Sequence, residues 1–357
     1  PRIGQLTAYN DAGIQLIGQG EGNVTFMCDT IPNQKIGVWV VTEDVEDITP
    51  PPPPAYCVTF SSPSQFSIQK TNAPPGFECS EDGETWTSWD GSTISSSGSS
   101  GSHEIYMRGT GNTYVCTNTD YHFVLTGENI SCSGNIENLL DWQTVANGGH
   151  PQMESKCFFG LFYGCTNLVS APDLPMTSIP HRCYGYMFAG CTQLTVAPAL
   201  PATTLGIGCY EGMFEGCNNL VIPPALPATT LAIQCYDKMF HNCTSLVSPP
   251  KLPATNLQKS CYSGMFQGCS SLTSLPALPA TTLAESCYDL MFYLCSNIKL
   301  SEAKTDTYTQ EYRVPSYGDG TIATGALDAM FRATGGTFAD TPEINKTYYL
   351  DKSNKIV

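Results

Sequence analysis

The chain has 357 residues, of which 41% are hydrophobic and only 13% are charged, and its formal net charge is −16. The low charged fraction leaves the surface to Ser, Thr, Asn, Gln and Gly, which favours an extracellular or virion protein over a cytosolic enzyme. The negative charge argues against binding to nucleic acid or anionic lipid, which requires a face rich in Lys and Arg. No apolar run approaches the roughly 20 residues of a membrane span, so membrane insertion is not expected.

Residues 1–48 are predicted to form short strands, because segments such as "GIQLIG" and "KIGVWVVTE" are β-branched or aromatic and are separated by turn residues. We expect a β-rich attachment segment here. The prolines of 49–54 then predict a stiff polyproline II linker. No basic head followed by an apolar stretch is visible at the start, so no signal peptide is expected.

Residues 55–133 are predicted to form a small β-sandwich, because several short strand-like segments follow one another at near-regular spacing. Asp82-Gly83 predicts a hairpin turn, and the Gly/Ser stretch at 95–102 predicts a loop tip. Trp86, Trp89 and Tyr106 could line a sugar-binding platform, but such residues more often pack in the core.

From residue 134 onwards the chain repeats itself every 26 residues, with cysteines, phenylalanines, leucines and prolines all in one register. Stacked repeats bury a core that no single repeat could bury alone, so this pattern predicts a solenoid. We assign 134–156 to an N-terminal cap, 157–300 to six coils, and 301–357 to a degenerate last coil with a C-terminal cap. The array is expected to be complete within the chain.

Each coil is predicted to contain a short helix, because Leu231, Cys235 and Met239 recur at i, i+4 and i+8. A very short strand and a Pro-x-x-Pro return would follow, since proline cannot donate to a sheet ladder. The expected fold is therefore a multidomain chain. It has a β-rich N-terminal segment, a small β-sandwich and an α/β solenoid with 26-residue coils.

The order Phe, Cys, Leu, Leu-Pro, Leu in "MFEGCNNLVIPPALPATTL" resembles the BspA-like (treponemal-type) leucine-rich repeats of bacterial surface proteins. The sequence pattern "CYxxMFxGCxxLxxxPxLPATTL" is similar to a variant of this repeat found in proteins of gut Bacteroidales and their phages. The likeness covers 130–340 strongly and 55–130 weakly. The coil length of 26 residues and the second proline depart from the family. The resemblance implies a leucine-rich-repeat fold and a role in adhesion.

The repeated cysteines allow three interpretations. Metal binding is disfavoured, because the C-x7-C spacing is unlike that of zinc sites and histidines do not follow the repeat. Systematic disulfides are disfavoured, because equivalent cysteines of adjacent coils would lie about 5 Å apart with parallel Cβ vectors, although a pair within a coil such as Cys209–Cys217 is conceivable. Buried free thiols in the core are preferred. The twelve core positions are Cys157, Cys165, Cys183, Cys191, Cys209, Cys217, Cys235, Cys243, Cys261, Cys269, Cys287 and Cys295.

Nothing in the sequence points to catalysis. The cysteines are equivalent to one another, no histidine is placed to activate one, and no phosphate loop or isolated carboxylate pair is present. We therefore predict a non-enzymatic protein without a cofactor. The alternative from another class is a glycan-active enzyme.

The predicted function is that of a phage virion surface protein, such as a head fibre, capsid decoration or receptor-binding fibre. Its repeats would adhere to a glycan or protein of the host surface or mucus, and residues 1–48 would bind other virion proteins. The alternative is a secreted bacterial cell-surface adhesin. The chain is expected to form a homo-oligomer, for which a trimer is one option.

Ligand-binding residues are expected at positions that vary between coils, because the framework positions serve the core. The candidates are Tyr163, His181, Arg182, Tyr186, Glu211, Glu215, Asp237, Lys238, His241, Lys259 and Tyr293.

Overall fold

The computed structural model describes residues 15–16, 26–27, 56–97 and 102–357. The chain divides into two compact units, Pro1–Pro53 and Pro54–Val357. In the first unit β1 (Gln15–Leu16) pairs antiparallel with β2 (Phe26–Met27). Apart from these four residues, the attachment segment predicted at 1–48 lies outside the described residues, as does the linker predicted at 49–54.

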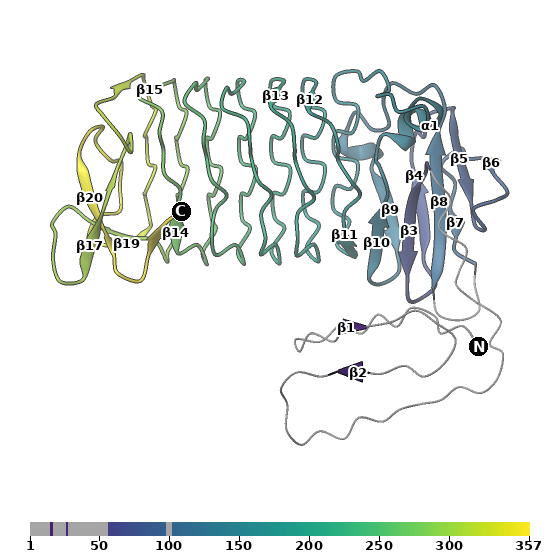
Figure 1. Cartoon of the computed structure of the whole chain (residues 1–357), viewed down its shortest axis with the longest axis horizontal. Coiled ribbons are helices and arrows are strands. Elements are labelled where there is room, and N and C mark those ends of the chain that lie inside the picture. The colour runs from purple at the N-terminus through teal and green to yellow at the C-terminus, as the bar shows by residue number, and fades with distance from the viewer. Residues whose placement is uncertain (1–14, 17–25, 28–55, 98–101) are drawn as a thin grey trace. The chain divides into compact units, whose positions relative to one another are not determined.

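The second unit is β-rich, with several small sheets and almost no helix. Two sheets lie at one end, a row of stacked coils follows, and further short strands lie at the other end (Figure 1). The described helices are α1 (Asn138–Ala146) and the 3-10 turn η1 (Thr119–Tyr121). The strands of the two sheets are β3 (Val58–Ser62), β4 (Ser67–Lys70), β5 (Phe77–Ser80), β6 (Thr87–Ser88), β7 (Ile94–Ser95), β8 (His103–Gly109), β9 (Phe123–Thr126), β10 (Ile130–Ser133) and β11 (Leu168–Ser170).

The two sheets, with α1, are called the β-module below. One sheet has six strands in the order β11-β10-β3-β8-β5-β6, and the other has three in the order β7-β4-β9. The sheets contact each other through Phe60 of β3 and Phe123 of β9, whose ring centroids lie 5.4 Å apart. The hairpin predicted at Asp82-Gly83 is confirmed, because β5 pairs antiparallel with β6 across it. Trp89 and Tyr106 are buried, as expected of core residues.

The short helix predicted in each coil is wrong. Residues 233–242 form consecutive turns, in which Gln234, Lys238 and Asn242 have φ values of 55°, 54° and 59°. Positive φ every fourth residue is incompatible with a right-handed helix and is the signature of type II turns. The period of four still brings Leu231, Cys235 and Met239 to one side, and all three are buried.

Backbone hydrogen bonds join each coil to the next along this turn segment. The Tyr236 N–H donates to the Cys261 carbonyl at 3.0 Å. The Phe240 N–H donates to the Met265 carbonyl at 2.9 Å. The intervening Met239 N–H instead closes its own turn. Alternate backbone donors therefore point along the stack, which holds successive coils in a fixed register.

Two columns of stacked aromatic rings run through the coils. The phenylalanine column has centroid spacings of 5.4–5.7 Å and planes within 2–7° of each other, over Phe162, Phe188, Phe214, Phe240, Phe266, Phe292 and Phe331. The tyrosine column has spacings of 5.6–6.0 Å over Tyr184, Tyr210, Tyr236, Tyr262 and Tyr288. Offset stacking of this kind adds to the hydrophobic stabilisation.

Short strands lie on either side of the prolines of the coils. β11 and β14 (Ser274–Leu275) come before the prolines of their coils, and β12 (Ser178–Ile179), β13 (Thr204–Leu205) and β15 (Thr282–Leu283) come after them. β12 pairs parallel with β13, whereas β14 and β15 belong to other small sheets. The proline returns lie between these two sets of strands, in agreement with the lack of a backbone donor on proline.

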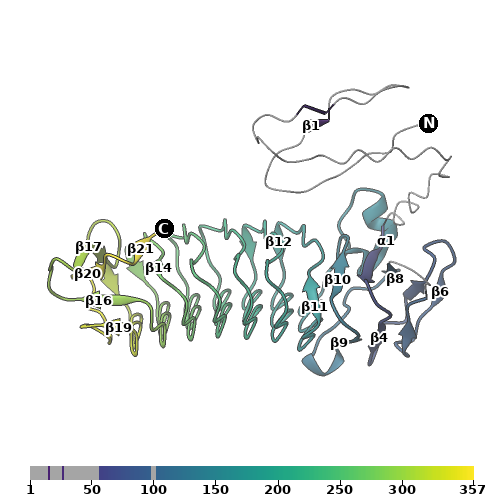
Figure 2. The same cartoon turned by 90° about the horizontal axis from the view of Figure 1, so that it is seen from below.

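The β-module closes the start of the stack. Phe162 of the first coil lies 5.7 Å from Phe123 and 6.2 Å from Phe60, between ring centroids. β11 of the same coil extends the six-stranded sheet by pairing parallel with β10. The core therefore continues from the sheets into the coils, and the N-terminal cap is larger than the predicted segment 134–156 (Figure 2).

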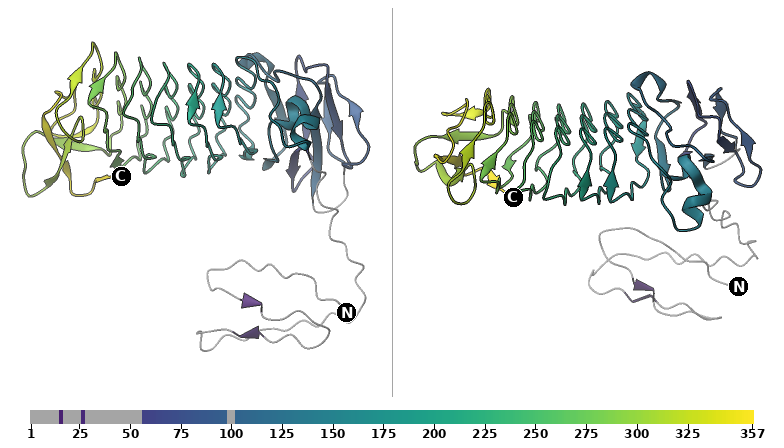
Figure 3. Two further views of the ribbon diagram at one scale, coloured as in Figure 1. Left: turned by 45° about the horizontal axis from the view of Figure 1, so that its top comes forward. Right: turned by 90° about the horizontal axis from the view of Figure 1, so that it is seen from above.

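The far end of the stack is closed by a coil with an insertion. The Tyr262 N–H donates to the Cys287 carbonyl of the next coil, and in the same way the Tyr288 N–H donates to the Ala326 carbonyl. The coil that follows Tyr288 therefore has its turn segment at Ala326, after the hairpin strand β17 (Tyr308–Arg313). β17 pairs with β20 (Thr347–Asp351), which lies beside β16 (Lys299–Ser301). The remaining strands are β18 (Thr321–Ile322), β19 (Gly335–Gly336) and β21 (Lys355–Ile356). Figure 3 shows the chain end returning beside β14, with which β21 pairs.

Candidate functional site

The twelve cysteines of the coils form two buried columns, and no cysteine in them is more than 4% exposed. In the first column Cys157 and Cys183 form a disulfide between adjacent coils, with their Cα atoms 5.0 Å apart. The argument against bridging equivalent cysteines is therefore wrong for this pair, because Cα atoms 5.0 Å apart are within disulfide range. The other ten cysteines of the columns are thiols.

The second cysteine of each coil has a specific partner. The Cys217 thiol donates to the Phe188 carbonyl of the preceding coil at 3.1 Å, and the Cys243 thiol donates to the Phe214 carbonyl at 3.1 Å. Burial raises the pKa of the Cys217 thiol to about 12. A neutral, inaccessible thiol is a poor nucleophile, so these cysteines are suited to structure and not to catalysis.

The eleven predicted ligand residues all lie along the turn segments of the coils, which we call the turn ribbon: residues 155–164, 181–190, 207–216, 233–242, 259–268 and 285–294. Their exposure differs. Tyr163, His181, Lys238 and Lys259 are exposed. Most of the others are partly buried, whereas Asp237 is only 9% exposed. The ribbon therefore offers fewer free side chains than the sequence indicates.

Three of the candidates bond to one another across two coils. The Arg182 Nη2 lies 3.0 Å from Glu211 Oε2, and the Tyr186 hydroxyl donates to Glu211 Oε1 at 3.2 Å. The Tyr186 ring covers Gly212, where an added Cβ would lie 2.4 Å from the ring. Gly212 is therefore required for the close approach, and the three side chains are largely engaged within the protein.

An imidazole–carboxylate contact and an ion pair also link neighbouring coils. The His241 Nδ1 lies 3.0 Å from Glu215 Oε1, and the exposed Lys259 Nζ lies 2.7 Å from Glu285 Oε1. Asp237 differs from these residues, because burial raises the pKa of its carboxyl to about 6. The charge of Lys238 opposes this shift, and the charge of Glu211 adds to it. Its Oδ1 has no hydrogen-bond partner among the described residues. Asp237 is thus a buried group and not an exposed ligand.

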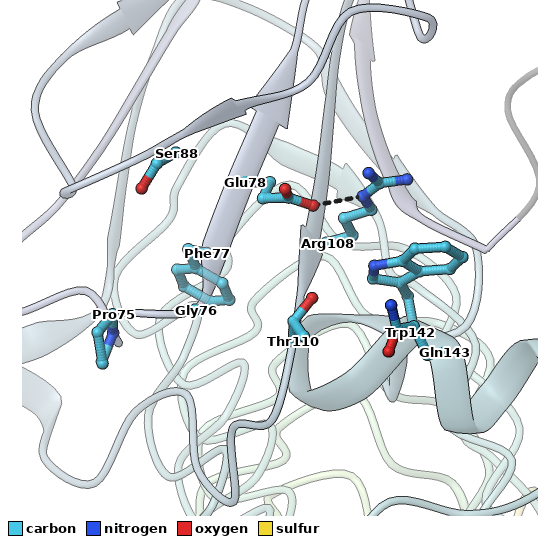
Figure 4. A pocket seen from close by; sticks show the side chains of 9 residues that line it. All are labelled: Pro75, Gly76, Phe77, Glu78, Ser88, Arg108, Thr110, Trp142 and Gln143. Atoms are coloured by element: carbon cyan, nitrogen blue, oxygen red, sulfur yellow. Dashed lines mark hydrogen bonds and ion pairs between the residues drawn. The ribbon is translucent and has the colours of Figure 1, made fainter.

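An open cleft of about 450 Å³ lies on the β-module, a place that the sequence did not single out. Its lining residues are Pro75, Gly76, Phe77, Glu78, Ser88, Arg108, Thr110, Trp142 and Gln143 (Figure 4). Arg108 Nε lies 2.7 Å from Glu78 Oε2. The Arg108 guanidinium lies over Trp86 at 3.9 Å and over Trp142 at 4.4 Å, measured to each ring centroid.

The sequence indicated only Trp86 of this arrangement, as part of a possible sugar platform. The other two members of that platform, Trp89 and Tyr106, are in the core instead. Trp142 comes from α1 and Arg108 from β8, and no motif connects them. A contact between two elements that are distant in sequence leaves no periodic signal, so sequence analysis missed it.

Comparison of the chain with protein-family models, curated proteins and solved structures gave no match. Within the part of the chain that the structure describes, no three His, Cys, Asp or Glu side chains are grouped so that they could hold a metal ion. No helix in that part is long and apolar enough to cross a membrane.

Proposed function

We propose that the protein is a non-enzymatic surface protein, in which a leucine-rich-repeat-type solenoid presents the turn ribbon for adhesion. The supporting observation is that each coil separates its buried, repeated positions from its exposed, variable positions. The repeated Cys, Tyr, Met and Phe positions are buried, whereas positions that differ between coils, such as Lys238 and Tyr163, are exposed on the ribbon. A rigid scaffold with variable outer residues is typical of solenoid binding proteins.

The setting that we propose is the surface of a phage virion, with residues 1–48 bound to other virion proteins and the ribbon facing a glycan or protein of the host or mucus. This setting rests on the resemblance in the repeat wording and on the neutral, weakly charged composition. The Cys157–Cys183 disulfide supports a location outside a reducing cytosol. A secreted bacterial adhesin would share that feature. Capsid and portal genes beside the coding sequence would favour the phage, and their absence would favour the bacterial alternative.

Binding of the 357-residue chain to host cells and to immobilised mucus glycans tests the adhesion proposal. Alanine at Tyr163, Lys238 and Lys259 together should reduce binding, because these are exposed candidates on three different coils. The matched control replaces Lys251, an exposed lysine in a proline return. Equal binding by both variants would contradict a role for the ribbon.

A further inference from the structure

We propose that the cleft on the β-module binds a neutral pyranose sugar, with Glu78 and Arg108 contacting its hydroxyl groups and the part of the Trp142 indole that Arg108 leaves uncovered contacting its C–H groups. The cleft floor is formed by β5 and the end of β8, and α1 supplies one wall through Trp142 and Gln143 (Figure 4). The site belongs to the β-module and not to the turn ribbon. It therefore stands independently of the ribbon's proposed role.

Arg108 is held in place before any ligand arrives. Its guanidinium lies over the Trp86 ring and also over the Trp142 ring. Its Nε forms an ion pair with Glu78. Its side chain is only 17% exposed. An arginine that is already ordered loses little conformational entropy on binding, which is a main cost of recognition by long side chains. Because both rings contact the guanidinium and Nε bonds to Glu78, the Nη atoms are the groups left for a ligand.

The polar groups of the cleft match a hydroxylated ligand. Among the residues that the structure describes, the Arg108 Nη atoms and Glu78 Oε1 have no hydrogen-bond partner, since the ion pair uses Nε and Oε2. The pair thus offers a donor edge and an acceptor oxygen side by side. Two neighbouring sugar hydroxyls can use both, one accepting from the guanidinium and the other donating to the carboxylate. Thr110, Ser88 and Gln143 add further uncharged polar groups at the rim.

The apolar part of the cleft fits the other face of a pyranose. Trp142 is half-buried and lines the cleft. The Arg108 guanidinium already lies over this ring, so a sugar's C–H groups would contact the exposed part of the indole that Arg108 leaves uncovered. A cleft with one aromatic wall and a few convergent polar groups is the usual form of a small-molecule site.

A charged ligand fits less well. An anion at the Arg108 edge would meet the Glu78 carboxylate, and the chain as a whole carries a formal charge of −16. A cation at Glu78 would meet the Arg108 guanidinium. Since the two charges compensate each other within 2.7 Å, the cleft is close to neutral and favours a neutral ligand.

The test titrates the full chain with methyl glycosides of glucose, galactose, mannose and N-acetylglucosamine, using ligand-observed NMR saturation transfer. We expect binding of at least one sugar with a Kd of about 1 mM, the range of weak small-ligand contacts. Glu78→Gln and Trp142→Ala should each weaken it about tenfold or more. The exposed Glu84, in the same hairpin but outside the cleft, provides the control Glu84→Gln, which should bind as the parent does.

Three outcomes would overturn the proposal. They are no saturation transfer to any of the four sugars, binding that survives both cleft substitutions in folded protein, and tighter binding of glucuronate that increases in Glu78→Gln. Circular dichroism and thermal melting establish that each variant is folded, and Gln143→Ala serves as an exposed cleft variant should Trp142→Ala fail to fold. Loss of cell binding in the ribbon variants with sugar binding retained would separate this site from the proposed function of the ribbon.

Discussion

The Cys243 thiol donates a hydrogen bond to the backbone carbonyl of Phe214, one coil earlier, at 3.1 Å. The same carbonyl accepts the Cys217 N–H within its own coil. The cysteine side chain therefore joins two coils through a group that an aliphatic residue of the same size lacks. This contact recurs at Cys191, Cys217, Cys269 and Cys295.

Replacement of Cys243 by alanine should lower the free energy of unfolding by about 1–3 kcal/mol. The substitution removes the hydrogen bond to Phe214 and leaves a small cavity in a fully buried position. Urea denaturation of parent and variant measures the difference. The control is Cys79→Ala in the β-module, where the buried thiol bonds to the Thr87 hydroxyl at 3.7 Å and not to the backbone of another coil, so the loss should be smaller. Equal losses in both variants would rule out a special role for the inter-coil contact.

Replacement of Tyr236 by phenylalanine should leave stability unchanged or raise it by up to about 1 kcal/mol. The Tyr236 ring stacks on Tyr210 and Tyr262, but its hydroxyl is buried without a partner among the described residues. Phenylalanine keeps the stack and removes an unpaired polar group, whose burial costs free energy. Thermal melting is the measurement. A clear fall in the melting temperature would mean that a bound water or an undescribed segment satisfies the hydroxyl.

The Asp237 carboxyl predicts a pH-dependent stability. Its pKa is raised from 3.8 to about 6 in the folded protein, first by burial. A raised pKa means that the folded state favours the protonated form, so the associated stability is present below about pH 4 and is lost as the pH rises through about 6. Asp237→Asn should therefore raise stability by about 1–3 kcal/mol at pH 8, and by much less at pH 4.

Melting curves of parent and Asp237→Asn at the two pH values test this expectation. The exposed Asp306 provides a control, because Asp306→Asn should change neither value. A variant that is less stable than the parent at pH 8 would show that the charged carboxylate has a stabilising partner.

The Cys157–Cys183 disulfide closes a loop of 26 residues, which should contribute about 3 kcal/mol by restricting the unfolded chain. A reductant should therefore lower stability in the parent and have no such effect in the double variant Cys157→Ser, Cys183→Ser. Peptide mapping without reduction should recover the two cysteines in one linked fragment. Recovery of both as free thiols from freshly oxidised protein would contradict the bridge.

The buried columns of the coils could be predicted because a 26-residue period marks them directly in the sequence. The spacing of Leu231, Cys235 and Met239 identified the correct inward face but the wrong element. A chain of turns that repeats every four residues produces nearly the same spacing as a helix. The distinguishing signal was the glycine series Gly208, Gly212 and Gly216, whose φ values of 60°, 57° and 72° favour glycine.

The contacts between coils and within the cleft could not be predicted in the same way. The 26-residue period does not predict that Arg182 and Glu211 form an ion pair. It also does not predict that Asp237, one repeat after Glu211, is buried. Arg108 and Trp142 meet only because α1 packs against β8. The tyrosine column has the same 26-residue signal as the phenylalanines, so it was available in the sequence and was overlooked.

The pairing of β21 with β14 decides how the stack can be tethered. Val357 donates to the Leu275 carbonyl, so the chain leaves the stack from its flank, beside the coil that contains Leu275, and not from the far tip (Figure 1). A biotin or fusion partner attached after Val357 would therefore hold the coils side-on to a sensor surface. One attached before Tyr56 would leave from the β-module at the opposite end. Comparing the two immobilisation geometries would show which flank of the coils must remain accessible for adhesion.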